Sequence, residues 1–281
     1  MVDHGRTSGW KSFWDHGGWW RALLLVAAYA LVYQGFGLVS GLAGGRFIDS
    51  DDLFGTAESV FFALALPILL GGLALLAFVW SVRWLREIFG PQPVGGNWWM
   101  WIAVPLVVIP IVLRVVGTEW TSYSVSVVLV TLVTGVFIGF AEELLTRGLA
   151  VNLLRRGGFG ERAVVLLSSM LFALLHSVNV LTGQPPLTVA ITVVYAFGFG
   201  AMMYLVLRVT GNIVWPMLLH AATDPTTMLA TGGLDAHGDT AGSAALIAFA
   251  GLFNFVYIAA AVLAVFLVRG RVGNGAEGLS R

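Results

Sequence analysis

Residues 123–154 read YSVSVVLVTLVTGVFIGFAEELLTRGLAVNLL, an apolar stretch long enough to cross a bilayer, with charged residues in its second half. A stretch of about 18 or more apolar residues is typical of a transmembrane helix. Only helices satisfy every backbone group in lipid without closing a barrel, and no segment alternates with a period of two. We mark eight such stretches, each to within a few residues at either end: 20–44, 57–82, 98–117, 123–154, 163–182, 187–209, 212–231 and 244–269. The sequence therefore predicts an all-α, polytopic membrane helix bundle of about eight transmembrane helices.

The composition agrees with this fold and excludes several functions. Of the 281 residues, 58% are hydrophobic and 11% are charged, whereas a soluble domain carries about a quarter charged residues. We therefore expect residues 1–281 to form a single integral membrane domain. The formal net charge of zero gives no reason to expect nucleic acid as a partner. The absence of cysteine excludes thiol catalysis, disulfides and cysteine-based metal sites.

The charged loops predict the orientation of the bundle. Counting the loops alternately, 12 of the 15 basic residues fall on one side, together with both chain termini. They are Arg6, Lys11, Arg21, Arg83, Arg86, Arg155, Arg156, Arg162, Arg208, Arg269, Arg271 and Arg281. The other loops hold one basic residue, Arg46, and the acidic residues Asp49, Asp51, Asp52, Glu58, Glu119, Asp235 and Asp239. The positive-inside rule makes the basic side, and hence both termini, cytoplasmic.

Seven ionisable residues lie within the predicted spans instead of in loops. They are Arg114, Glu142, Glu143, Arg147, His176, His220 and Asp224. Because an ionisable group at the middle of a bilayer costs about 2.5–3.5 kcal/mol on insertion scales, each of them needs a partner or a function. Arg114 stands alone on its span, so we expect it to snorkel or to pair with an acid, and we assign it no chemistry.

The fourth span brings two adjacent carboxylates into the membrane. Glu143 and Arg147 are four residues apart and can pair on one face of a helix. Glu142 points about 100° away from Glu143, which leaves it free to face the bundle interior as a general base. A buried structural ion pair with a spare carboxylate is the alternative interpretation.

The fifth and seventh spans supply two histidines. Phe172 and His176 are four residues apart, so the phenyl ring packs one turn below the imidazole. His220 and Asp224 have the same spacing, and a carboxylate one turn away can orient an imidazole. Pro216 precedes His220 by four residues and is expected to open the backbone there. Two carboxyls and two histidines from three spans are the groups needed to hold and deprotonate a water, with or without a metal.

These residues resemble the motifs of a known family. The pattern Glu-Glu-x3-Arg, Phe-x3-His and His-x3-Asn/Asp is similar to that of the CAAX protease and bacteriocin-processing (CPBP, or Abi) family, which includes the type II CAAX prenyl endopeptidases. The motifs match at Glu142, Glu143 and Arg147, at Phe172 and His176, and at His220 and Asp224, within a core of about residues 123–231. The resemblance implies an intramembrane endopeptidase.

The resemblance also implies a role for each matched residue. Glu142 would activate a water together with His176, while His220 and Asp224 would stabilise the oxyanion, and Glu143–Arg147 and Phe172 would support the site. This chain has Asp224 where the prenyl endopeptidases have Asn, and an ionised Asp would repel an oxyanion. It is then either protonated or acting on His220 or a metal. Zinc bound by His176, His220 and Glu142, and glutamate chemistry without a metal, both fit the residue types.

The sequence does not identify the substrate. The excess of Arg over Lys, 14 to 1, points to a bacterial source and an inner (plasma) membrane, where a small membrane-associated or bacteriocin-like peptide is as good a candidate as a CAAX protein. Two other functions remain as alternatives: a non-catalytic binding or immunity scaffold, and a proton-coupled transporter, which also uses intramembrane acids and histidines.

Overall fold

The computed structural model describes residues 9–232 and 243–273, except for the side chain of Thr182. Arg6, Asp235, Asp239 and Arg281, which entered the predicted orientation, lie outside the described residues.

The described residues are helical and contain no β-strand, as predicted. The α-helices are α1 (Gly9–Asp15), α2 (Trp19–Gly44), α3 (Ala57–Val60), α4 (Leu66–Ser81), α5 (Leu85–Phe89), α6 (Ala103–Gly117), α7 (Val125–Glu143), α8 (Val151–Arg156), α9 (Glu161–Leu175), α10 (Pro186–Thr210), α11 (Val214–Thr231) and α12 (Ala244–Leu267). Short 3-10 segments are η1 (Gly45–Phe47), η3 (Trp98–Ile102), η4 (Trp120–Ser122) and η6 (His176–Thr182). Two π-helical segments, η2 (Phe61–Ala65) and η5 (Leu144–Ala150), join α3 to α4 and α7 to α8.

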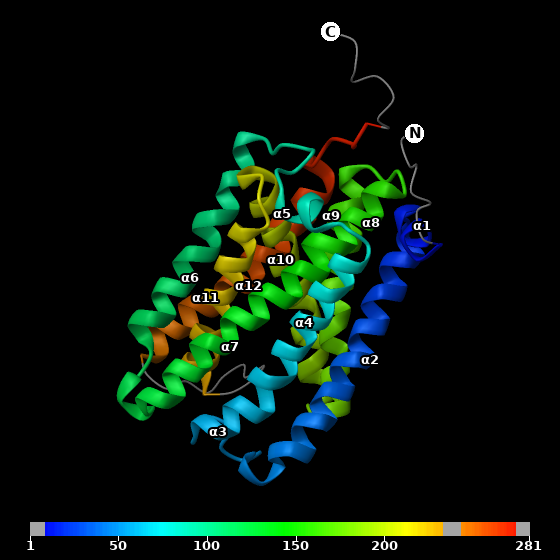
Figure 1. The fold of residues 1–281 in the computed structure, drawn as a ribbon. Coiled ribbons are helices and arrows are strands. Elements are labelled where there is room, and N and C mark those ends of the chain that lie inside the picture. Colours follow the sequence, from blue (N-terminus) through cyan, green and yellow to red (C-terminus); the bar gives the residue numbers. More distant parts are fainter. Residues whose placement is uncertain (1–8, 233–242, 274–281) are drawn as a thin grey trace.

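Seven of these helical segments are long and apolar enough to cross a membrane. They are Trp19–Phe47, Ala57–Ser81, Trp98–Gly117, Val125–Arg156, Glu161–Leu181, Pro186–Thr210 and Ala244–Leu267. The eighth predicted span, 212–231, is the helix α11, which does not qualify. It carries His220, Asp224 and four threonines, which lower its hydropathy. The helix α11 nevertheless runs along the bundle beside α7 (Figure 1). The helix α1 and the last turn of α12 both lie at one end of the bundle (Figure 1).

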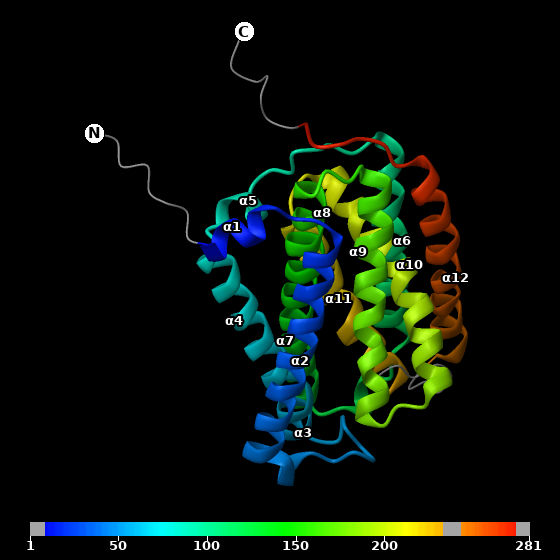
Figure 2. The ribbon, with the colours of Figure 1, turned by 90° about the vertical axis from the view of Figure 1, so that its right-hand side faces the viewer.

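The outer helices present apolar side chains to the surroundings. Leu31, Leu38 and Leu42 of α2 are 75%, 73% and 89% exposed. By contrast, 67% of an 18-residue apolar stretch of α10 is buried inside the bundle. The corresponding share is 22% for the segments that contain α2 and α12. Figure 2 shows α4 on one side of α7 and α11, α2 passing in front of α7, and α9, α10 and α12 on the other side. Because such exposed leucines are stable only in lipid, the chain is an integral, multi-pass membrane protein.

Two glycines let α7 and α11 approach closely. A Cβ at Gly139 would lie 2.4 Å from the Met217 carbonyl oxygen and 2.6 Å from the Ala221 nitrogen, and one at Gly135 would lie 2.6 Å from the Ala221 carbonyl oxygen. Glycines four residues apart on one helix are typical of close helix packing in membranes. The contact aligns the C-terminal end of α7 with the middle of α11, where four of the intramembrane ionisable residues lie.

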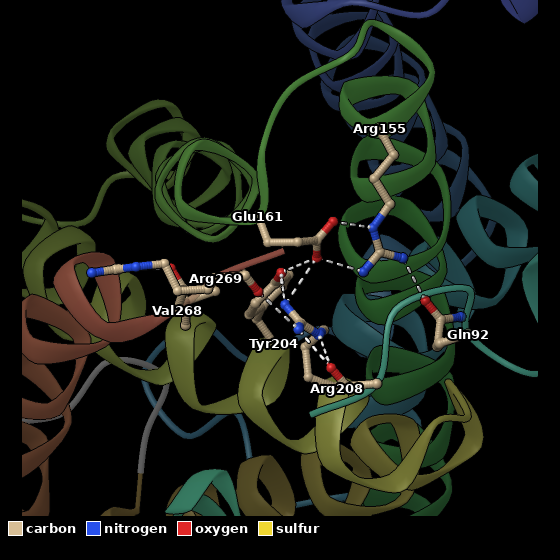
Figure 3. Close-up of polar contacts among 8 residues, drawn as sticks. Gln92, Arg155, Glu161, Tyr204, Arg208, Val268 and Arg269 are labelled. Carbon is tan, nitrogen blue, oxygen red and sulfur yellow. Dashed lines mark hydrogen bonds and ion pairs between the residues drawn. The ribbon is translucent and has the colours of Figure 1, made fainter. Parts of the chain in front are cut away.

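A second group of buried charges ties together one end of the bundle (Figure 3). Glu161, at the start of α9, is fully buried and accepts two hydrogen bonds from Arg155, each 2.8 Å long. It also accepts a 3.1 Å hydrogen bond from Arg208 and one from the Tyr204 hydroxyl. One carboxylate therefore balances two guanidinium groups in the interior.

The same arginines hold two loops against the helices. Arg208 donates to the Gly95 carbonyl oxygen at 2.6 Å and to the Arg269 carbonyl oxygen at 3.2 Å, while Arg155 donates to Gln92 at 2.7 Å. Arg155 and Arg208 had been counted as loop charges for the orientation, but they are only 8% and 3% exposed. Both arginines are buried because each pairs with the buried Glu161. The count of charges in the loops did not consider this pairing.

We expect Glu161→Gln to lower the free energy of unfolding by roughly 3 kcal/mol or more, because two buried guanidinium groups lose the carboxylate that they share. Glu87→Gln is the matched control: its carboxylate binds Arg156 at 2.6 Å but is 44% exposed, so a loss below about 1 kcal/mol is expected. Thermal unfolding in detergent measures both. Equal losses in the two variants would contradict a structural role of the buried cluster.

Candidate active site

The helix α7 ends at the two adjacent glutamates, Glu142 and Glu143, and continues as the π-helical segment η5. Such segments are frequent at functional sites because they change the direction in which side chains point. The Thr146 hydroxyl donates to the Glu142 carbonyl oxygen at 2.6 Å, which gives that backbone group a partner where the helix widens. An uninterrupted helix had been expected here, so the π-helical segment is a difference from the prediction.

Glu143 is the centre of a sealed group of charges. The predicted ion pair is present: Arg147 Nε lies 3.2 Å from Glu143 Oε2, and both side chains are 0% exposed. The other carboxylate oxygen, Oε1, lies 2.8 Å from His220 Nδ1. A carboxylate accepts hydrogen bonds, so Nδ1 of His220 carries a hydrogen and donates it. Glu143 thus orients His220, a contact that the sequence had not indicated.

One glycine and a phenylalanine complete this sealed layer. Gly200 of α10 leaves room for Arg147, which donates to the Gly200 carbonyl oxygen at 2.7 Å. The Phe172 ring lies under the Arg147 guanidinium, with 4.5 Å from Cζ to the ring centroid. The same ring meets His176 at 5.1 Å and His220 at 5.7 Å in edge-to-face contacts. Phe172 therefore packs against Arg147 and against both imidazoles, and helps to hold these three side chains in place.

The remaining nitrogen of His220 faces two less buried carboxylates. His220 Nε2 lies 3.5 Å from Asp224 Oδ2 and 3.9 Å from Glu142 Oε2. The Asp224 and Glu142 side chains are 28% and 21% exposed, whereas His220 is nearly fully buried. The site consequently has a sealed layer around Glu143 and an accessible layer that contains Glu142 and Asp224, with His220 between them.

His176 belongs to the accessible layer. It follows the last residue of α9, begins the 3-10 segment η6, and is half-buried. Its Nδ1 lies 3.2 Å from the Phe172 carbonyl oxygen. Because a carbonyl oxygen only accepts, Nδ1 is the donor, and Nε2 of the neutral ring keeps its lone pair. His176 is close enough to Glu142 to interact with it electrostatically.

Two alternatives were expected for Arg114, to snorkel or to pair with an acid, and the structure fits the second; for Pro216 it differs from the expectation. Arg114 of α6 does not snorkel: it is 7% exposed, and its guanidinium interacts electrostatically with Asp224 and Tyr257. Pro216 lies in the first turn of α11, where a missing amide hydrogen costs nothing, so it does not open the backbone before His220. The proline inside that helix is Pro225, directly after Asp224.

The zinc prediction depends on how the candidate ligands lie. Among residues 9–232 and 243–273, no group of three or more His, Asp or Glu side chains is arranged to hold a metal ion. Nδ1 of His220 and Nδ1 of His176 are engaged with Glu143 and with a backbone carbonyl, respectively. The zinc ion therefore stays a prediction, and no step below passes through it.

Comparison with known proteins identifies this part of the chain. Residues 124–226 match the family model described as type II CAAX prenyl endopeptidase Rce1-like. This segment is similar to that family. No curated protein and no solved structure matches the chain significantly. The matched segment includes all seven motif residues, from Glu142 to Asp224, whereas the core of 123–231 expected from the motifs stays a prediction.

Several supporting residues were not found by sequence reasoning. Thr146, Gly200 and Phe199, whose ring meets His220 at 5.0 Å, follow no motif spacing. The pair Gly135 and Gly139 does have a readable signal, because GVFIG places two glycines four residues apart just before the glutamates.

We expect Gly139→Ala to destabilise the protein by about 2 kcal/mol and to lengthen the Glu143–His220 contact, because the added methyl group meets backbone atoms of α11 that cannot move independently. Gly37→Ala on α2 is the matched control, since a Cβ there has no atom within 4 Å, and a helical Gly→Ala change is neutral or stabilising. Thermal unfolding of both variants tests this. A Gly139→Ala protein as stable as wild type would show that close contact of α7 and α11 is not required.

Proposed function

We propose that this protein is an intramembrane endopeptidase that hydrolyses a peptide bond of a membrane-associated peptide or protein with a water activated by Glu142 and His176. The Rce1-like match supports a protease of the CAAX type. The observation that carries the proposal is the pairing of an accessible carboxylate, Glu142, with a histidine, His220, whose other nitrogen is fixed by a sealed carboxylate 2.8 Å away.

The first step needs a base and a held water. The water lies between the Glu142 carboxylate and Nε2 of His176, and both of these groups accept its hydrogens. Glu142 takes one proton as the water oxygen bonds to the carbonyl carbon of the substrate. A carboxylate in a partly buried site is a suitable base because few water molecules compete for it.

The second step needs a donor for the oxyanion and a proton for the leaving group. His220 donates from Nε2 to the developing oxyanion, while Glu143 holds its Nδ1. Asp224, 3.5 Å from the same nitrogen, acts on His220 and not on the oxyanion, and the Arg114 guanidinium offsets its charge. The carbon–nitrogen bond then breaks, and Glu142 passes its proton to the leaving amine, so that atoms and charges balance.

The substrate class follows from the location of the site. Glu142 is preceded by 17 residues of α7, so a substrate must reach the interior of the bundle. A peptide that is held at the membrane by a lipid or an apolar segment meets this condition. We propose such a peptide, CAAX-type or bacteriocin-like, as the substrate, a bacterial inner membrane as the location, and the cytoplasm as the side of both termini.

A binding scaffold and a proton-coupled transporter are the rival functions. Both use the fold without hydrolysing a peptide. The transporter predicts charges distributed along a path across the membrane, whereas Glu142, His176, His220 and Asp224 gather at one place. This clustering favours a hydrolase.

We expect Glu142→Gln to lower the rate of peptide cleavage by about 10²–10⁴-fold without loss of thermal stability, because Gln keeps the shape and hydrogen bonding but cannot accept the proton. The assay uses a quenched-fluorescence CAAX-type peptide, with and without a prenyl group on its cysteine, and protein in detergent or liposomes. Glu87→Gln, an exposed glutamate outside the site, should cleave at the wild-type rate. A Glu142→Gln protein that cleaves normally would show that Glu142 is not the base.

A further inference from the structure

Tyr29 is a buried residue whose hydroxyl has no partner. It lies in the first half of α2, is 7% exposed, and its Oη is buried without a hydrogen-bond partner among the described residues. A buried tyrosine hydroxyl usually has a partner, because removing it from water without one costs free energy. The helix α2 lies outside the matched segment 124–226, so the family motifs assign Tyr29 no role.

The surroundings hold this hydroxyl in one place. A Cβ on Gly71 of α4 would lie 2.7 Å from Tyr29 Oη and 3.3 Å from two ring atoms, so the tyrosine occupies space that only a glycine leaves free. On its own helix the Tyr33 ring stacks with the Tyr29 ring at 6.2 Å, with 25° between the planes. The neighbouring Gly72 packs against Phe140 and Ala141, directly before Glu142. The contact places α4, and the hydroxyl beside it, next to the last turn of α7.

Glu142 has a matching unpaired atom. Its Oε2 is buried and lacks a hydrogen-bond partner among the described residues. His220 Nε2 lies 3.9 Å from this oxygen, too far for a hydrogen bond. Both Tyr29 and Tyr33 are near enough to Glu142 to interact with it electrostatically. A buried donor and a buried acceptor, close together but not hydrogen-bonded, are groups that one bound water can join.

The hydrogen-bonding capacity of a water explains why a third group is needed. Glu142 and Nε2 of His176 both accept, so together they orient the two hydrogens of the water but neither of its lone pairs. A donor on one lone pair leaves the other directed at the substrate carbon. Arg147 and Nδ1 of His220 are committed to the sealed layer, and Tyr29 offers a free hydroxyl.

We propose that Tyr29 is a further catalytic residue: its hydroxyl donates a hydrogen bond to the water that Glu142 and His176 activate, and so aims that water at the scissile carbonyl. The inference rests on the proposed function. It extends the site from three helices of the family segment to α2, and it assigns Gly71 the role of leaving space for the hydroxyl.

The test is cleavage by Tyr29→Phe in the assay described above. We expect kcat to fall by about 10–100-fold while KM stays within about twofold, because the water is misdirected and the substrate contacts are unchanged. Thermal stability should hardly change. Tyr123→Phe is the control: its hydroxyl donates to the Leu229 carbonyl oxygen at 2.9 Å, so it should lose stability and keep kcat. If Tyr29 had no part in catalysis, Tyr29→Phe would keep the wild-type kcat, as Tyr123→Phe should.

A second variant places the hydroxyl elsewhere without deleting it. Gly71→Ala puts a methyl group 2.7 Å from Oη, so it displaces the hydroxyl and should lower kcat in the wild-type background, but add little in the Tyr29→Phe background. Tyr29→Phe with more than half the wild-type kcat would overturn the inference. If Glu142→Gln is inactive in the same experiment, only the role of Tyr29 fails; if Glu142→Gln is as active as wild type, the proposed function fails as well.

Discussion

The Glu143 carboxylate has a guanidinium on one oxygen and an imidazole on the other, and its side chain has no exposed surface. Taking such a group out of water costs several kcal/mol, which the partners offset only when the geometry is good. Rotation of α7 or a shift of α11 would separate Glu143 from His220 and remove one of the two partners of the buried carboxylate. The buried contact thus fixes the relative position of two helices and, through it, of the groups that they carry, Glu142 and Asp224.

The close packing of α7 and α11 makes that contact attainable. Glu143 and His220 are 77 residues apart in the sequence, and a hydrogen bond of 2.8 Å between them requires the helix backbones to approach closely. Gly135 and Gly139 permit this approach because they add no side chain between the helices. The less buried groups, Glu142 and Asp224, lie on the same two helices and inherit their alignment. Stability and proposed reactivity therefore occupy neighbouring residues: the sealed carboxylate orients His220, and the accessible one is the proposed base.

The sequence was sufficient for features that depend on local spacing. Apolar length located the helices within a few residues, and the four-residue spacing of Glu143 and Arg147 predicted their ion pair. Contacts between distant segments were not predictable in this way. The Glu143–His220 hydrogen bond, the burial of Arg208 against Glu161 and the approach of Tyr29 to Glu142 depend on how helices pack. The predicted span at 212–231 is present as the helix α11 but does not qualify as a membrane span, and a helix enclosed by others can carry polar residues that a lipid-facing helix cannot.

The substitution of Asp224 for the Asn of the prenyl endopeptidases fits a charge count of the site. Three carboxyl groups, Glu142, Glu143 and Asp224, meet two buried guanidinium groups, Arg147 and Arg114. The five groups together carry one negative charge, so one further positive charge would make the set neutral. A proton on His220 Nε2, which lies between Glu142 and Asp224, would supply that charge.

That proton is also the one that the proposed oxyanion contact requires. An Asn at position 224 would remove one negative charge and leave the buried Arg114 without the acid that balances it. We therefore infer that Asp224 and Arg114 act as a unit in this chain. In the proposed mechanism, His220 then presents the same donor to the peptide although the residue beside it differs from the family pattern.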